Sequence, residues 1–67
     1  MKLGEAILMG DVRAYGQLSD LIRERGGTYH ETFLLIREIH TKAGRTPPDE
    51  ADFEDKMAEC EEQESKS

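Results

Sequence analysis

Apolar residues recur at the spacing of an α-helix from the start of the chain, and this spacing limits the folds open to it. With successive residues placed about 100° apart, one half of the helix collects Leu3, Ile7, Leu8, Val12, Ala14, Tyr15, Leu18, Leu21 and Ile22. The other half collects polar side chains. We therefore predict one amphipathic helix over residues 3–25. Gly26-Gly27 ends it, because glycine readily takes the positive φ that follows a helix.

A second helix follows from a start signal and a stop signal. Thr28 and Glu31 have the Thr-x-x-Glu spacing of a capping box, in which both side chains satisfy free backbone amides. The pattern predicts a helix over residues 29–42, which Gly44 closes. Its buried face would contain Tyr29, Phe33, Leu35, Ile36, Ile39 and Ala43.

A third start signal precedes the acidic end of the chain. Thr46 is a candidate cap, and the two prolines and the acids that follow suit a first helical turn. We predict a helix over residues 48–62 and fraying over residues 63–67. Because its apolar stripe is narrow, we expect the helix to dock weakly. The stripe consists of Phe53, Met57 and Cys60.

These patterns predict an all-α fold without strands or internal repeats. The helices 3–25 and 29–42 would form a long hairpin, and the short helix 48–62 would complete a small three-helix arrangement. A chain of 67 residues is long enough for one domain only. Such a domain buries roughly 60% of the surface that its unfolded chain exposes, so a large catalytic cleft is not expected.

The charge is divided unevenly along the chain. Residues 1–45 carry seven basic and six acidic side chains, which gives +1, whereas residues 46–67 carry nine acids against two lysines, which gives −7. The net charge of −6 therefore belongs to the C-terminal segment. Within a single domain we distinguish a near-neutral helical hairpin body, residues 1–45, from an acidic C-terminal helix and tail, residues 46–67.

Three features favour a cytoplasmic protein. The single cysteine cannot form an internal disulfide, which suits a reducing compartment. The longest apolar run, residues 33–36, is far short of the roughly 20 residues that span a bilayer. Gly4 and Glu5 interrupt the first apolar stretch, so we expect no signal peptide and no membrane partner.

Few side chains suit catalysis or metal binding. His30 and His40 are ten residues apart, about 15 Å along a helix, and neither belongs to a metal-ligand pattern. We expect His30 to be solvated and His40 to border the core. Cys60 lies among glutamates that disfavour its thiolate, so we interpret it as a small apolar contact. We predict no enzymatic activity and no cofactor.

Two residues depart from the helical patterns. Asp11 lies in the apolar half of the first helix, where it either caps a helix that restarts after Gly10, pairs with Tyr15 or an arginine across an interface, or belongs to a site. We favour the cap. Leu34 lies on the polar side of the second helix beside Arg37. Because chains of this size often need a partner, we predict a homo-oligomer with the candidate contact residues Leu34, Arg37, Asp11 and Tyr15.

Four acids of the third helix form a row. The acidic row consists of Asp52, Asp55, Glu59 and Glu62. Neighbouring members are roughly 5–6 Å apart on a helix, near the interval between nucleic-acid phosphates. The row predicts binding to a protein with a basic surface, most concretely inhibition of a nucleic-acid-binding site. The alternative for the same residues is a solvated segment that only confers solubility.

Two further functions remain as alternatives. Residues 18–30 fit a helix-turn-helix, whose second helix would present His30, Glu31, Leu34, Arg37, Glu38 and Thr41 to DNA. Two carboxylates on that face and a body of charge +1 disfavour direct nucleic-acid binding. The other alternative is a structural helical homo-oligomer.

The N-terminal third resembles a known family. Residues 1–8, with Asp11-Val12 and residues 18–25, look like the first helix of small bacterial helical proteins sometimes named septicolysins. This resemblance implies an all-helical oligomer and no active-site residue. In general character the chain is also similar to phage-encoded inhibitors of the anti-CRISPR type, which implies an inhibitor of phage or bacterial origin.

Overall fold

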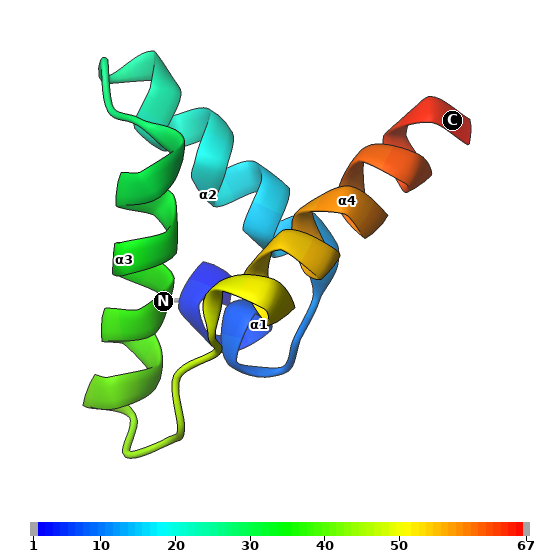
Figure 1. The fold of residues 1–67 in the computed structure, drawn as a ribbon. Helices are drawn as coiled ribbons and strands as arrows, with labels where there is room; N and C mark the ends of the chain where they lie inside the picture. The colour runs from blue at the N-terminus through cyan, green and yellow to red at the C-terminus, as the bar shows by residue number, and fades with distance from the viewer. Residues whose placement is uncertain (1, 67) are drawn as a thin grey trace.

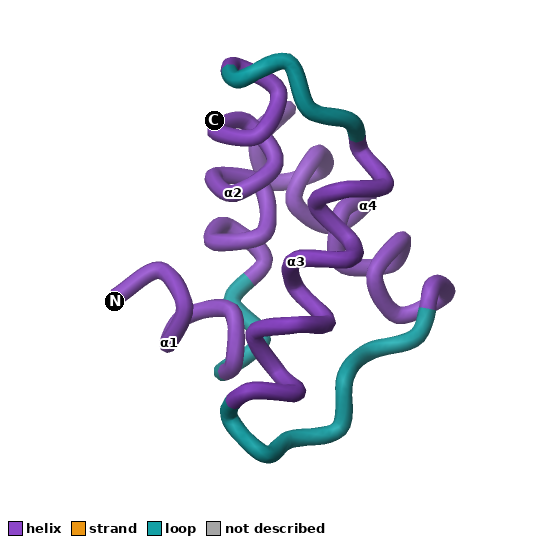
Figure 2. The backbone as a smooth tube through the Cα atoms, turned by 90° about the vertical axis from the view of Figure 1, so that its left-hand side faces the viewer, coloured by secondary structure: helices purple, strands orange, loops and turns teal. Residues whose placement is uncertain are grey.

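The protein folds into four helices. The computed structural model describes the backbone of residues 2–66 and the side chains of residues 2–64. The helices are α1 (Lys2–Leu8), α2 (Val12–Glu24), α3 (Tyr29–Lys42) and α4 (Glu50–Lys66), and no strand occurs in the described range. The fold is therefore all-α, as predicted. In Figure 1, α2 and α3 form the hairpin, and α4 packs across α2 and extends beyond it. Figure 2 shows the long loop that joins α3 to α4.

The predicted helix over residues 3–25 is divided into α1 and α2. Gly10 has a φ of 82°, a left-handed conformation that interrupts the helical hydrogen-bond ladder. Asp11 then caps α2, because its Oδ1 accepts a hydrogen bond from the Arg13 backbone N–H at 3.0 Å. The prediction of one continuous helix was wrong, whereas the favoured interpretation of Asp11 as a cap is confirmed. The break turns α1 back across the hairpin, where Ile7 is fully buried.

The glycine stop signals and the Thr28 half of the capping box are confirmed, whereas no hydrogen bond joins the Glu31 side chain to the Thr28 backbone N–H among the described residues. Gly26 has a φ of 82° after α2, and Gly44 has a φ of 74° after α3. At the start of α3, the Thr28 Oγ1 accepts a hydrogen bond from the Glu31 backbone N–H at 3.2 Å. α3 consequently has the predicted bounds, because local capping and glycine geometry determine both of its ends.

α4 begins later and ends later than predicted. Its cap is Asp49, whose Oδ1 accepts a hydrogen bond from the Asp52 backbone N–H at 2.8 Å. The expected cap, Thr46, lies in the loop together with the two prolines. An aspartate three residues before a free backbone amide makes the same capping hydrogen bond as a threonine. Asp49 is nearer to the helix than Thr46 and therefore serves as the cap. The helix continues to Lys66, past the predicted end at residue 62, and residue 67 lies outside the described residues.

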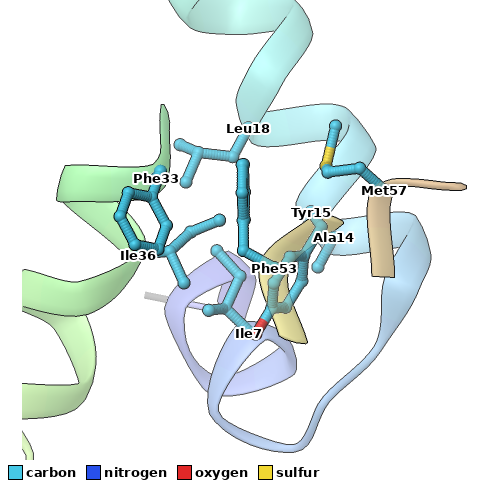
Figure 3. Close-up of a cluster of buried hydrophobic side chains, with 8 residues drawn as sticks. All are labelled: Ile7, Ala14, Tyr15, Leu18, Phe33, Ile36, Phe53 and Met57. Carbon is cyan, nitrogen blue, oxygen red and sulfur yellow. The ribbon is translucent and has the colours of Figure 1, made fainter. Parts of the chain in front are cut away.

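All four helices contribute to one hydrophobic core (Figure 3). Phe53 of α4 is only 1% exposed and lies at its centre. Its ring centroid is 5.1 Å from that of Phe33, 5.2 Å from that of Tyr29 and 6.3 Å from that of Tyr15. A single buried aromatic ring contributes a large apolar area. The expectation that the narrow stripe docks weakly is therefore not supported, since α4 supplies the central side chain of the core.

Three residues assigned to buried faces are exposed. They are Leu21, Tyr29 and Ala43. Tyr29 is the first residue of α3 and Ala43 follows its last residue, so both lie at helix ends, where neighbouring helices cover less of the surface. The remaining residues of the predicted faces are buried or half-buried.

Candidate protein-binding face of α4

The acidic row lies on the solvent side of α4. All four of its side chains, Asp52, Asp55, Glu59 and Glu62, are exposed. In the part of the chain that the structure describes, none of them forms an ion pair with a basic side chain. Asp52 does act on the buried Tyr15, whose pKa is raised first by burial and then by this carboxylate. The row is thus a group of solvated negative charges on an ordered helix.

The rotation of α4 follows from its apolar stripe. Phe53, Met57 and Cys60 are spaced by four and three residues, and all are buried. Because this spacing keeps them on one side of a helix, the acidic row is turned toward solvent. The cap at Asp49 determines where the helix begins. The anchored stripe therefore determines where the carboxylates are presented.

A second group of acids lies on the other side of the apolar stripe. We name Glu50, Glu54 and Glu61 the second acidic flank. They act on the phenol of Tyr29, whose pKa is raised mainly by burial and then by Glu54 and Glu61. Glu50 adds a smaller effect in the same direction, and Arg23 acts in the opposite direction. Our sequence reasoning missed this flank, although its spacing of four and seven residues is also helical.

α2 and α4 pack tightly against each other at Gly16. A Cβ atom added to this glycine would lie only 2.5 Å from the Sγ of Cys60. Cys60 is buried, as its interpretation as an apolar contact predicts. Its pKa is raised, mainly by burial and next by the charge of Glu64, while a backbone hydrogen bond with Gly16 acts in the opposite direction. We inferred a poorly reactive thiol from the nearby acids. Burial contributes more than these acids to the raised pKa.

A shallow hollow of about 550 Å³ lies beside the acidic row. It is formed mainly by the end of α1, the loop before α4 and α4 itself, and Tyr15 of α2 and His40 of α3 also line it. Asp52, Asp55 and Glu59 line it, whereas Glu62 does not. Met9 also lines it and is 84% exposed, which makes it the most exposed of the large apolar side chains described. The hollow could not be derived from the sequence, because its lining comes from all four helices and from the loop before α4.

The two histidines occupy the predicted environments. His30 is exposed, and its ring centroid is 6.1 Å from that of Phe33. His40 is 8% exposed at the edge of the core, with its Nδ1 2.8 Å from the Ile36 carbonyl oxygen. Over the described residues, no three histidine, cysteine or acidic side chains gather in a way that could hold a metal ion.

The four candidate self-association residues do not form one surface. Tyr15 is buried in the core of its own chain, so the expectation that it contacts another subunit is not supported. Asp11 is exposed but serves as the cap of α2. Leu34, 50% exposed, and Arg37 share the outer face of α3, where the Arg37 guanidinium lies 5.7 Å from the centroid of the Phe33 ring.

The same face of α3 is the recognition surface that a helix-turn-helix would need. All six of the side chains proposed for it are exposed, and some of them also contact their own helix. Glu38 forms an ion pair with Lys42 at 3.2 Å, and the Thr41 hydroxyl donates to the Arg37 carbonyl at 2.9 Å. The face therefore combines both signs of charge with an apolar centre, which differs from the basic surfaces that bind phosphates.

Comparisons with family models, curated proteins and solved structures found no match to this chain. Within the described residues, every helix is too short or too polar to cross a lipid bilayer.

Proposed function

We propose that this protein is a non-enzymatic helical interaction module that binds a basic surface of a partner protein through the acidic row. In the most concrete form it is a cytoplasmic inhibitor that occupies a nucleic-acid-binding site. The observation that carries the proposal is the exposure of Asp52, Asp55, Glu59 and Glu62, which form no ion pair with any described side chain, on a helix anchored by Phe53.

An anchored helix suits this task better than a flexible acidic tail. The row extends over eleven residues, a rise of about 15 Å along the helix, and its charges keep a fixed spacing because Phe53 is buried in the core. A binding surface that is ordered in advance loses less conformational entropy on association. Clustered charge of one sign also steers an oppositely charged partner and raises the association rate at low salt.

The acidic row is tested by reversing its charges together. A variant with Asp52, Asp55, Glu59 and Glu62 all replaced by lysine is compared with the wild type as bait in a nuclease-treated extract of the native host. We expect the wild type alone to capture a nucleic-acid-binding protein, and duplex DNA or RNA to displace that protein. Circular dichroism checks that the variant remains helical. Equal capture by both baits would refute the proposal.

A matched pair of double variants separates a specific surface from net charge. Asp55→Lys with Glu59→Lys changes the acidic row, and Glu50→Lys with Glu54→Lys changes the second acidic flank by the same amount of charge. All four residues are exposed. The proposal predicts that the first pair weakens capture much more than the second. Equal weakening would mean that only the overall charge matters, as for a segment that confers solubility.

A structural homo-oligomer is a second candidate because Leu34 is half exposed at the centre of the outer face of α3. A large apolar side chain in this position suits contact with another copy. If Leu34 forms such a contact, Leu34→Glu converts the oligomer to monomers in sedimentation velocity experiments. A wild type that sediments as a monomer at high concentration would exclude this function.

A further inference from the structure

We infer that the hollow beside α4 binds a segment of the partner in which an arginine adjoins an apolar side chain. The inference rests on the proposed function, because it specifies the part of the partner's basic surface that contacts the acidic row. It follows from three properties of the hollow: an apolar wall, a rim of carboxylates and a histidine ring.

The apolar wall comes from the end of α1 and from the loop before α4. Ile7, Leu8, Met9 and Pro47 line this side. Ile7 is fully buried, whereas Met9 is almost fully exposed at the edge of the hollow. A methionine has a flexible and polarizable side chain that adapts to different apolar surfaces. Met9 is therefore suited to cover an apolar side chain of the partner next to the acidic row.

The charge of the hollow selects a cation. Asp52, Asp55 and Glu59 line it, and Lys56 is the one basic side chain among its lining residues. Lys56 lies against the turn between α1 and α2, since its Nζ is 3.7 Å from the position that a Cβ atom on Gly10 would occupy. Three carboxylates against one ammonium leave an excess of negative charge. This excess disfavours phosphate groups and favours a guanidinium or ammonium group.

His40 adds an acceptor to the lining of the hollow. The residue is 8% exposed, and it lines the hollow. When Nδ1 donates to the Ile36 carbonyl at 2.8 Å, the neutral ring carries a free lone pair on Nε2. No described residue provides a hydrogen-bond partner for this atom, which is accessible to solvent rather than buried and unsatisfied. A partner donor that reaches the hollow would replace water there.

These properties favour arginine over lysine. A guanidinium is planar, carries five N–H donors and is weakly hydrated, so it can bind carboxylates while its flat face contacts apolar groups. The compact and strongly hydrated ammonium of lysine suits a solvated rim better than a partly apolar hollow. The predicted recognition element is thus an arginine with a neighbouring leucine, methionine or similar side chain.

The first experiment titrates the ¹⁵N-labelled wild-type protein with three blocked synthetic peptides and follows its amide resonances by NMR. One peptide alternates Arg-Arg with Leu-Leu, the second replaces each Leu by Ser, and the third replaces each Arg by Lys. We expect the Arg-Leu peptide to bind about tenfold more tightly than either of the others and to shift the resonances of Met9, Gly10 and Lys56. Equal affinities, or no shifts at the hollow, would overturn the inference.

Two pairs of variants locate the binding site. Met9→Ser and Leu21→Ser each remove an exposed apolar side chain, but only Met9 lines the hollow. Glu59→Gln and Glu54→Gln each remove one exposed carboxylate charge from α4, but only Glu59 lines the hollow. We expect Met9→Ser and Glu59→Gln to weaken Arg-Leu binding several-fold and their matched controls to leave it unchanged. Equal effects within each pair would overturn the inference.

The outcome separates this inference from the proposed function. Charge reversal of the whole acidic row could abolish partner capture while the two variants within each pair bind the Arg-Leu peptide equally. In that case the acidic row is the binding site and the hollow is not. If charge reversal leaves capture unchanged, the proposed function fails as well. Shifts at Met9 and Gly10 that depend on protein concentration without peptide would assign the hollow to a second copy of the chain, and this result too would overturn the inference.

Discussion

The two faces of α4 differ in what they do for the protein. The inner face carries Phe53, Met57 and Cys60, which are buried and connect the helix to the rest of the core. The outer face carries the acidic row, which is exposed and forms no ion pair among the described residues. The side chains that hold this helix in the core are thus distinct from the exposed acids that we propose for binding. We therefore expect stability and binding to be separable, with the acids contributing little to folding.

The largest expected effect is that of Phe53→Ala. The substitution removes the ring at the centre of the core, and such truncations cost about 3–5 kcal/mol. Because a domain of this size has little stability to lose, we expect a largely unfolded protein in urea titrations followed by circular dichroism. The control is Glu62→Ala on the outer face, which should unfold like the wild type. A loss below about 1 kcal/mol for Phe53→Ala would contradict the central role of the inner face.

A smaller loss is expected where α4 crosses α2. Gly16→Ala places a Cβ 2.5 Å from the Cys60 Sγ. Overpacking of this kind costs about 1–3 kcal/mol, which exceeds the gain of about 1 kcal/mol from the better helix propensity of alanine. In the background of Cys60→Ala the Sγ is absent, so Gly16→Ala should no longer destabilise. A double-mutant cycle measured by urea unfolding checks this coupling; additive effects would show that the two residues do not limit the crossing.

The stability of the contact between α4 and α2 should also fall at alkaline pH. Burial raises the pKa of Cys60 above its ordinary value of 9.0 and that of Tyr15 above 10.0. A thiol or phenol with a raised pKa in the folded state does not change the stability below its unfolded pKa. As the pH rises from there through the folded pKa, the unfolded state loses its proton first, so the free energy of unfolding falls. We therefore expect the melting temperature to fall above about pH 9, and less so in Cys60→Ala. Reaction of Cys60 with a thiol reagent at pH 8 should be slow until urea unfolds the chain.

The smallest effect on stability is expected on the outer face. Asp55→Asn with Glu59→Gln removes two exposed charges and no described ion pair. The free energy of unfolding should change by no more than about 0.5 kcal/mol, while partner binding weakens strongly. Urea unfolding and partner capture are measured on the same preparation. A large loss of stability in this variant would show that the two faces are not independent.

Much of the helical structure could be predicted because its signals are local. The cap at Thr28 and the glycines 26 and 44 lie within a few residues of the ends that they determine, and α3 has the predicted bounds. The role of Asp11 was also predictable, because a Gly-Asp pair signals a break and a new start. The error over residues 3–25 arose because helical periodicity continued through Gly10, and we gave it more weight than the break signal of the Gly-Asp pair.

The candidate binding face was predictable only in part. The spacing of the acidic row identified four residues that share a side of α4, and the structure places them all in solvent. The hollow beside them was not predictable, because Met9, His40 and the row come from distant parts of the sequence. A single exposed methionine in a sequence also has no feature that distinguishes it from a core residue.

The sequence by itself determined that this protein is helical, where α3 begins and ends, and that the negative charge lies in its C-terminal segment. These properties depend on hydrogen bonds, periodicity and charge within short stretches of chain. Only the tertiary structure decided that α1 folds back over the hairpin, that Phe53 is the centre of the core and that a hollow forms beside the acidic row. Those properties depend on how separate helices pack against one another, and the helical period of one segment does not specify its partner.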